Sequence, residues 1–379
     1  MTRFLIVNTD YPGFLDALYA AHPGLEHEDY ARQLQVRNAS LFGVSDFYPR
    51  NLTELGHPAV EVSINNRRLQ GAWAREHGLP LRSVGAARLV LRRGILPWIV
   101  HDQSAWMEHL LAAQIEDFRP DVILTHSLCD LRPAFWSEMR SHYRLLVGQI
   151  ASPLSSDIDL SACDLMLSSL PNFVERFRGA GLRAELFRLA FDPIVLESLK
   201  AQETGDNSGP PIDVSFVGSL SPHHGGRLKW LEQVCRETPV QVWGQGVDSL
   251  PEGSSIRAAY RGAAWGIDMF RILSRSRISL NHHIEISGPY ANNMRLYETT
   301  GVGTLLLTDW KTNLAEMFAP ETEAAVYRTP AECVERIGYY LSHEAERNQT
   351  ARAGQQRTLR DHTYGQRMAQ LVELVESRL

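Results

Sequence analysis

The sequence predicts two doubly wound α/β domains, each built on a parallel sheet. The chain has 379 residues, whereas a single hydrophobic core stops growing at about 250–300 residues. Short apolar runs alternate with amphipathic stretches along both halves, which is the pattern of parallel α/β layers. A polar segment with two glycines and two prolines, residues 202–211, separates the halves and is typical of a linker or surface loop.

Composition excludes several classes of protein. Hydrophobic residues make up 44% and charged residues 22% of the chain, which is ordinary for a globular protein and excludes a disordered, collagenous or coiled-coil chain. The net charge of −6 indicates no general attraction to nucleic acid. The four cysteines form no disulfide or zinc pattern. Because the first apolar run is too short for a signal peptide and none has the roughly 18 residues of a spanning helix, we expect a cytoplasmic protein.

The first half contains six strand candidates. Most are continuous apolar runs, as expected for strands buried on both faces. They are Arg3–Asn8, Ala59–Ile64, Asp121–His126, Arg144–Gln149, Asp164–Ser168 and Ala184–Phe187. Helical periodicity is found at Asp46–Leu55, Ser104–Asp117, Ala134–Arg140 and Asn172–Gly179. Residues 14–44 are a long connection, which is either a surface insertion with short helices or a functional segment.

The second half repeats this plan. Its strand candidates are Ile212–Val217, Val240–Trp243, Ile278–Asn281, Thr304–Leu307 and Ala324–Tyr327. Its helix candidates are Gly225–Arg236, Trp265–Ser274, Asn292–Thr300, Ala331–Ser342, Glu344–Arg360 and Gly365–Ser377. We therefore predict an N-terminal domain over residues 1–192 and a C-terminal domain over residues 193–362. A last helix within residues 363–379 could cross back to the first domain.

Ligands of doubly wound sheets bind at the carboxyl ends of the strands, so two such domains predict a site in the cleft between them. Fingerprints for a dinucleotide, a P-loop and a nucleophile elbow are all absent from the sequence. No metal is predicted. Asp157-Ile-Asp159 lies in a polar loop, and the side chains of the adjacent pairs His223-His224 and His282-His283 would diverge on a strand.

The most informative segment runs from Gly288 to Asp309. A Gly-Pro turn leads into a helix, then glycines, then a buried strand. Asn292 or Asn293 would cap this helix, and the exposed amides and positive dipole at its start would bind a phosphate. Glu298 lies at the right reach for sugar hydroxyls. A helix with no role beyond structure is the alternative interpretation.

Several pieces of the second half occur in the order of a known family. They are Val214-Ser-Phe-Val-Gly218-Ser219, Arg227, Val242-Trp-Gly244-Gln-Gly246, Arg295-Leu-Tyr-Glu298 and Gly301-Val-Gly303. From about Asp213 to Val375 the chain resembles the C-terminal domain of the spore-maturation CgeB-like family of glycosyltransferases. The first half is similar more loosely, and residues 1–110 match only in the order of strands and helices.

The resemblance implies the GT-B fold, in which two Rossmann-like domains hold a nucleotide diphosphate-sugar in their cleft. It implies a bacterial, hexosyltransferase-like, metal-independent enzyme without a cofactor other than its donor co-substrate. The acceptor, whether glycan, protein, lipid-linked or small molecule, is not identified. In this reading Glu298 holds the ribose, and helix amides with Arg295 or Arg227 face the diphosphate. The donor-binding residues implied are Gly218, Ser219, Arg227, Tyr260, Asn292, Asn293, Met294, Arg295 and Glu298.

Candidate catalytic residues of the first half are His126 and Asp10, which follow strands, while Tyr11 and Gly13 form a candidate acceptor or phosphate loop. Either catalytic candidate could be the base of an inverting enzyme. In a retaining enzyme the departing diphosphate can take the proton, and His126 would orient the donor sugar. We favour retention, although Tyr290 stands where many retaining GT-B enzymes carry a second glutamate. A non-catalytic GT-B-like binding or assembly protein and a nucleotide-sugar epimerase are the alternatives.

A basic and apolar stretch runs from Leu81 to Val100. It carries Arg82, Arg88, Arg92 and Arg93 among large apolar side chains. Such a stretch could touch a membrane that holds a lipid-linked acceptor. The alternative, which we favour, is a solvated helix that leads into the core.

Overall fold

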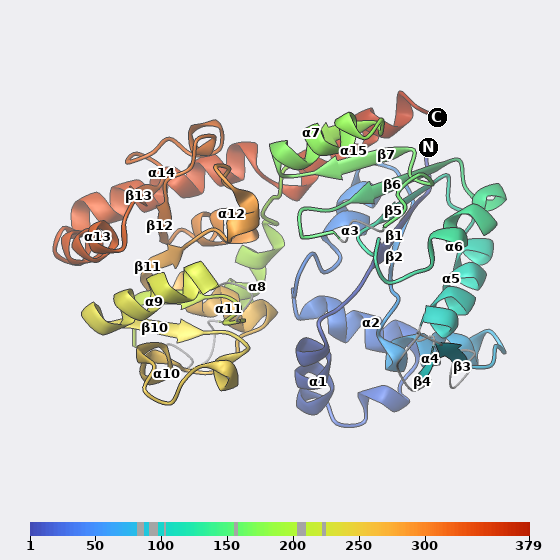
Figure 1. Ribbon diagram of the computed structural model, residues 1–379, viewed down its shortest axis with the longest axis horizontal. Helices are drawn as coiled ribbons and strands as arrows, with labels where there is room; N and C mark the ends of the chain where they lie inside the picture. The colour runs from blue at the N-terminus through green and yellow to red at the C-terminus, as the bar shows by residue number, and fades with distance from the viewer. Residues whose placement is uncertain (82–86, 91–97, 102–103, 155–157, 203–209, 222–224) are drawn as a thin grey trace.

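The computed structural model consists of two α/β halves that lie side by side (Figure 1). It describes residues 1–81, 87–90, 98–101, 104–154, 158–202, 210–221 and 225–379. Each half has one parallel sheet, as the alternation of apolar and amphipathic segments predicts. The predicted class, two Rossmann-like α/β domains, is confirmed.

The N-terminal sheet has six parallel strands in the order β2-β1-β5-β6-β7-β8. Strand β1 lies between β2 and β5 and pairs with them in register, Phe4 opposite Ala59 and opposite Val122. The strands are β1 (Phe4–Asn8), β2 (Ala59–Ser63), β5 (Val122–Thr125), β6 (Leu145–Gln149), β7 (Leu165–Ser168) and β8 (Ala184–Leu186). The helices of this half are α1 (Pro12–Ala21), α2 (Tyr30–Ala39), α3 (Phe47–Glu54), α4 (Arg67–Glu76), α5 (Ser104–Phe118), α6 (Pro133–Glu138) and α7 (Pro171–Gly179), with short 3₁₀ turns at η1 (Leu25–His27) and η2 (Arg140–His142).

The C-terminal sheet has five parallel strands in the order β10-β9-β11-β12-β13. They are β9 (Ile212–Val217), β10 (Val240–Trp243), β11 (Ser276–Asn281), β12 (Leu305–Asp309) and β13 (Ala325–Tyr327). The helices are α8 (Ile194–Gln202), α9 (Gly225–Glu237), α10 (Ser255–Ala259), α11 (Gly266–Ser274), α12 (Met294–Gly301), α13 (Pro330–Ser342), α14 (Glu344–Asp361) and α15 (Tyr364–Glu376), with 3₁₀ turns at η4 (Val247–Ser249), η5 (Glu285–Ser287) and η6 (Leu314–Glu316).

All eleven predicted strands and all ten predicted helices are present with small shifts of their ends. The stretch Leu81–Val100 differs from the prediction of a helix. Two antiparallel strands, β3 (Ala87–Val90) and β4 (Trp98–His101), form a small separate sheet there. Arg82, Arg92 and Arg93, on which the idea of a membrane contact depended, lie outside the described residues. No helix among the described residues is long and apolar enough to cross a membrane.

One buried apolar cluster extends through both halves. It includes Phe4 and Phe47 of the N-terminal half and Leu296 and Leu306 of the C-terminal half, and the segment between the halves enters it through Phe191. Gly301 makes this close packing possible, because a Cβ atom at that position would lie 2.4 Å from Cγ of Phe191. The two halves are therefore joined by a substantial hydrophobic interface.

Helix α15 lies over the N-terminal half (Figure 1). The amide of Tyr364, at its start, donates to the carbonyl of Phe191 at 3.0 Å, and the Tyr364 ring packs against Phe47 of α3 at 5.2 Å between centroids. A capping box begins the helix, in which Thr363 and Gln366 satisfy each other's backbone amides. The end of the chain thereby ties the two halves together a second time.

Candidate active site

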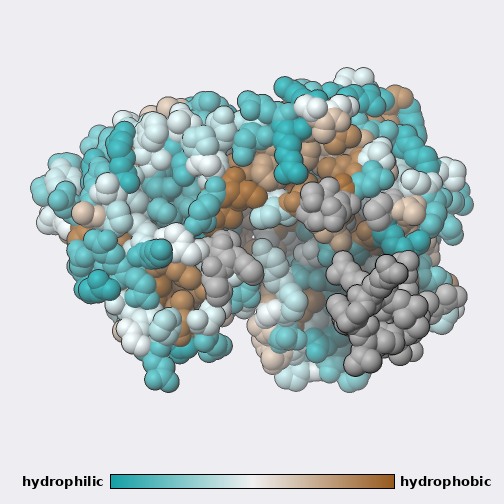
Figure 2. Space-filling view, in the orientation of Figure 1, coloured by the Kyte–Doolittle hydropathy of each residue, from teal (hydrophilic) through white to brown (hydrophobic). Residues whose placement is uncertain are grey.

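A cavity of about 650 Å³ lies between the carboxyl ends of the two sheets. Its walls include Asn8 and Gln149 at the ends of β1 and β6, and Val217 and Asn281 at the ends of β9 and β11. Figure 2 shows that one face of the molecule is hollowed between the two halves. This is where parallel sheets bind ligands, and the volume suits a small molecule.

Most of the residues predicted from the sequence line this single cavity. They are Asp10, Tyr11, His126, Gly218, Ser219, Arg227, Asn292, Asn293, Met294, Arg295 and Glu298. Gly13 and Tyr260 are not among the lining residues. A Cβ atom on Gly13 would lie 3.3 Å from Gln245 and 3.4 Å from Trp265, both of which line the cavity. Tyr260 donates its hydroxyl to the carbonyl of Gly244 at 2.9 Å, so it holds a lining turn in place.

The start of α12 lines the cavity through Asn292, Asn293, Met294 and Arg295. Asn293 caps the helix by accepting from the amide of Leu296 at 3.3 Å. Its own side-chain amide donates to Asn281 at 2.6 Å, and Asn281 donates to Thr308 at 2.9 Å. This chain of side chains fixes the helix start against the ends of β11 and β12. A helix start that is rigid and rich in unpaired amides attracts anions.

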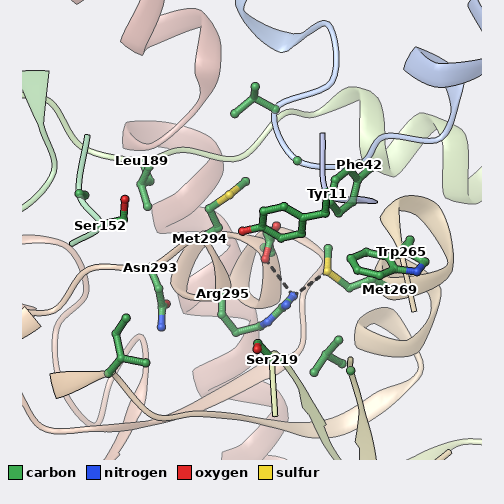
Figure 3. A pocket seen from close by; sticks show the side chains of 18 of the residues that line it. Tyr11, Phe42, Ser152, Leu189, Ser219, Trp265, Met269, Asn293, Met294 and Arg295 are labelled. Carbon is green, nitrogen blue, oxygen red and sulfur yellow. Dashed lines mark hydrogen bonds and ion pairs between the residues drawn. The ribbon is translucent and has the colours of Figure 1, made fainter. Parts of the chain in front are cut away.

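Glu298 and Arg295 form an ion pair one turn into α12, with 2.8 Å between Oε2 and Nη1. Glu298 is buried, and burial raises its pKa while Arg295 lowers it. Nη1 of Arg295 also lies 3.1 Å from the sulfur of Met269, and its Nε is buried without a hydrogen-bond partner among the described residues (Figure 3). Arg295 therefore orients Glu298, and both residues line the cavity.

Arg227, near the start of α9, is the second cation of the C-terminal wall. It donates to the carbonyl of Ser219 and lies 5.9 Å from the ring centroid of Phe216. It forms no ion pair within 4.0 Å among the described residues. Burial lowers its pKa to about 10, opposed by Glu285. A half-buried guanidinium that has no ion-pair partner in direct contact among the described residues is well placed to receive an anion.

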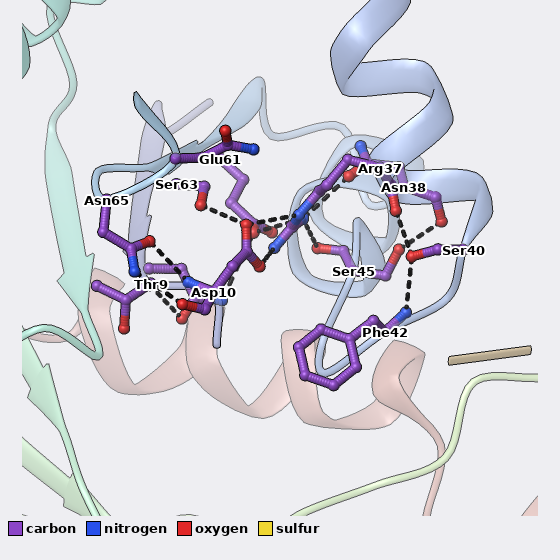
Figure 4. Close-up of polar contacts among 12 residues, drawn as sticks. Thr9, Asp10, Arg37, Asn38, Ser40, Phe42, Ser45, Glu61, Ser63 and Asn65 are labelled. Atoms are coloured by element: carbon purple, nitrogen blue, oxygen red, sulfur yellow. Dashed lines mark hydrogen bonds and ion pairs between the residues drawn. The ribbon is translucent and has the colours of Figure 1, made fainter. Parts of the chain in front are cut away.

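Asp10 lines the cavity, but its carboxylate is tied into a buried network of polar side chains (Figure 4). Its carboxylate accepts from Arg37 at 2.8 and 3.3 Å and from the Ser63 hydroxyl at 2.5 Å. Arg37 also pairs with Glu61 at 2.9 Å. Both oxygens of Asp10 are engaged, so its carboxylate serves as the ion-pair partner of Arg37. We therefore do not propose Asp10 as a catalytic base.

His126 follows β5 and packs edge-on against the Tyr48 ring, with 5.4 Å between the ring centroids. Its Nδ1 atom is buried and has no hydrogen-bond partner among the described residues. Burial lowers the pKa of His126 to about 4, opposed by a hydrogen bond with the Gln149 side chain, so the imidazole is neutral at neutral pH. A neutral imidazole with so low a pKa is a weak base but can exchange hydrogen bonds with a hydroxyl group.

The long connection over residues 14–44 proves to be part of the site. Phe42 lines the cavity and meets Trp265 of the opposite half at 5.2 Å between centroids, edge to face, with the Tyr11 ring beside both (Figure 3). The amide of Ile267 donates to the carbonyl of Ser40 at 2.7 Å. Sequence reasoning missed these residues, together with Arg37, Tyr48 and Gln149. The unusual length of the connection was the available signal.

Metal binding receives no support from the side chains that the structure describes. They contain no group of three or more His, Cys, Asp or Glu residues placed to hold an ion. His282 bonds to the Tyr327 hydroxyl at 3.0 Å and stacks on Trp230, whereas His283 bonds to Asp309 at 2.6 Å. His223, His224 and Asp157 lie outside the described residues.

The fold and the cleft define a GT-B protein, with two Rossmann-like domains facing each other across a ligand site. Residues 227–373 match the family described as glycosyl transferase-like, so most of the C-terminal half carries a glycosyltransferase-like domain. No curated protein sequence matches the chain significantly.

Solved structures agree with this fold along the whole chain. Sucrose-phosphate synthase from Thermosynechococcus elongatus is 11% identical with a TM-score of 0.59, covering 100% of this chain and 99% of that one. Anabaena HepE in complex with UDP-glucose is 13% identical with a TM-score of 0.59, covering 100% of both chains. Trehalose 6-phosphate synthase from Burkholderia multivorans is 13% identical with a TM-score of 0.59, covering 100% of this chain and 99% of that one.

Proposed function

We propose that the protein is a glycosyltransferase that moves a sugar from a nucleoside diphosphate donor to a hydroxyl group of an acceptor. The observation that carries the proposal is the grouping of Arg227, the α12 start and Glu298 on one wall of the cleft. These groups lie within the region that matches the glycosyl transferase-like family. Because HepE was solved with UDP-glucose, a UDP-hexose is the first donor to test. Membership of the CgeB-like family remains part of this proposal.

The proposed donor site uses each group according to its chemistry. Glu298, oriented by Arg295, accepts hydrogen bonds from ribose hydroxyls. Arg227 and the amides at the start of α12 bind the diphosphate. These positive groups stabilise the charge that develops on the leaving diphosphate, which is the largest contribution expected for this reaction and needs no metal ion.

The transfer itself breaks the bond between the anomeric carbon and the diphosphate oxygen and forms one to the acceptor oxygen. We propose that the anomeric configuration is retained and that the acceptor proton passes to the departing diphosphate. The low pKa of His126 supports this, because such an imidazole is a poor proton acceptor at neutral pH. His126 then serves as a hydrogen-bonding group toward a sugar.

Calorimetric titration with UDP, ADP, GDP and dTDP tests the donor site. We expect one of them to bind and Glu298→Ala to weaken it at least tenfold, since a hydrogen bond to a charged group contributes about 1.5–3 kcal/mol. Asp268→Ala is the matched control, because Asp268 also pairs with an arginine three residues away but is exposed. If no nucleoside diphosphate binds, the proposal fails and a non-catalytic GT-B-like protein becomes the better reading.

The reaction is tested by NMR with the nucleotide sugar that carries the preferred base. A transferase gives a new glycoside only when an acceptor is present, and its anomeric coupling reports retention or inversion. An epimerase would change the sugar without any acceptor, which would contradict the proposal.

A further inference from the structure

The two walls of the cleft differ in charge. The C-terminal wall contains Arg227, Arg295 and Glu298. The N-terminal wall is lined by neutral hydrogen-bonding groups, namely Tyr48, Gln149, Ser152, Ser169 and the imidazole of His126. Figure 3 shows Ser152 and Leu189 on the opposite side of Met294 from Trp265 and Met269. An anion is therefore attracted to one wall and not to the other.

The charged groups that the described residues place on the N-terminal wall are Asp10 and Arg37, and they are occupied with each other. Arg37 is buried at 3% exposure and pairs with Asp10 at 2.8 Å and with Glu61 at 2.9 Å. It also donates to the carbonyl of Ser45 (Figure 4). One guanidinium thus faces two carboxylates, so the network has no positive charge left over for a phosphate or carboxylate ligand.

The same wall has hydrogen-bonding capacity that the protein itself leaves unused. The Ser169 hydroxyl and Nδ1 of His126 have no hydrogen-bond partner among the described residues. Both atoms are buried, and Ser169 as a whole is only 6% exposed. Buried polar groups almost always have partners, so such groups beside a cavity indicate a position completed by a ligand. Nε2 of Gln149 donates to the Tyr48 hydroxyl at 3.0 Å in the same wall.

Apolar side chains share this wall with the polar groups. Ile150 and Leu189 line the same cavity as Gln149 and Ser169. A wall that combines neutral donors and acceptors with apolar patches matches a ring that carries hydroxyl groups on its edge and C–H groups on its faces.

We infer that the N-terminal wall binds the acceptor as an uncharged, hydroxyl-bearing ring, a neutral saccharide or polyol, and selects against phosphorylated or carboxylated sugars. This inference rests on the proposed function, and it names the class of its second substrate. Rejection of charged acceptors follows from desolvation, because an anion would lose its hydration at a wall on which the described residues offer no free cation.

The test compares matched acceptors with the full-length protein and the donor identified by titration. Release of nucleoside diphosphate is measured with glucose, maltose, sucrose and inositol, and with glucose 6-phosphate, sucrose 6-phosphate and glucuronate. We expect at least one neutral compound to raise the rate at least tenfold above donor hydrolysis, and the charged compounds to stay within twofold of it. Preference for a charged acceptor, or no acceleration by any neutral one, overturns the inference.

Single substitutions test whether acceptor binding depends on the N-terminal wall. We expect Ser169→Ala to raise the KM for the neutral acceptor at least fivefold while the KM for the donor stays within twofold. Ser342→Ala, at the exposed end of α13, should change neither. Equal changes in both KM values for Ser169→Ala would indicate a structural role and count against the inference. Failure of nucleotide binding itself would refute the proposed function, so the two failures are distinguishable.

Discussion

The Arg37 network makes a quantitative prediction through Glu61. Burial raises the pKa of this carboxyl from its ordinary value of 4.5 to about 7, with Asp10 adding to the effect and Arg37 opposing it. Between these values the folded state retains a proton that the unfolded chain has released. Glu61 therefore stabilises the fold fully below pH 4.5 and loses this contribution as the pH rises through 7.

The size of the effect follows from the two pKa values. At about 1.4 kcal/mol per pKa unit, the interval from 4.5 to about 7 corresponds to roughly 3 kcal/mol of unfolding free energy. Glu61→Gln removes the titration but keeps an amide that can bond to its neighbours. The difference in unfolding free energy, Glu61→Gln minus wild type, should therefore rise by about 3 kcal/mol between pH 4.5 and 7.5.

Urea unfolding followed by circular dichroism and tryptophan fluorescence at four pH values measures this difference. Contributions from other titrating groups cancel, because both proteins contain them. Glu54→Gln, which changes an exposed carboxyl on α3 outside this network, is the matched control. If the Glu61→Gln difference is independent of pH, or falls as the pH rises, the reasoning about this buried network is wrong.

Three further predictions test the cleft and the interface. Arg227→Met should lower kcat/KM for the donor by about 10²–10³-fold, as loss of a charge-stabilising donor does elsewhere; a change below threefold in steady-state kinetics would contradict this role. Because burial holds the pKa of His126 near 4, the rate should show no inflection between pH 6 and 7, and a step there that disappears in His126→Gln would refute the assignment. Gly301→Ala should destabilise the protein by about 1–3 kcal/mol through the clash with Phe191. The control is Gly338→Ala, whose Cβ atom would meet nothing within 4 Å. It should stabilise its helix by about 0.5–1 kcal/mol when both variants are compared by urea unfolding.

Helix α2 is one of the elements that were not predicted from the sequence, and its burial pattern explains why. Helix α2 buries Gln33 and Arg37 rather than apolar side chains, so it has no apolar periodicity to detect. Both buried residues have partners far away in the chain, for example Asp10 for Arg37 and Tyr19 for Gln33. The strands β3 and β4 lie in a stretch whose mixture of arginines and apolar residues resembles a helix face. Local patterns do not register burial that depends on distant partners.

The candidate site also has a part that the sequence predicts and a part that it does not. Its C-terminal wall could be predicted because α12 brings Asn293, Arg295 and Glu298 together within two helical turns. Of its N-terminal wall, Asp10, Tyr11 and His126 were predicted from their places at strand ends. Tyr48, Gln149 and Ser169 were not, because they lie on α3, at the end of β6 and just after β7, far apart in the sequence. They meet only when parallel strands align their carboxyl ends.

By itself, the sequence determined the two parallel sheets, the cleft at their carboxyl ends and the helix start that faces it. These follow from apolar runs and capping residues, which act over a few positions along the chain. Only the tertiary structure decided which charges are free and which are paired. Asp10 is taken up by Arg37, Glu298 is oriented by Arg295, and Arg227 remains without an ion pair among the described residues. Such pairing depends on distances across sheets and between halves, because Coulomb attraction and burial act through space rather than along the sequence.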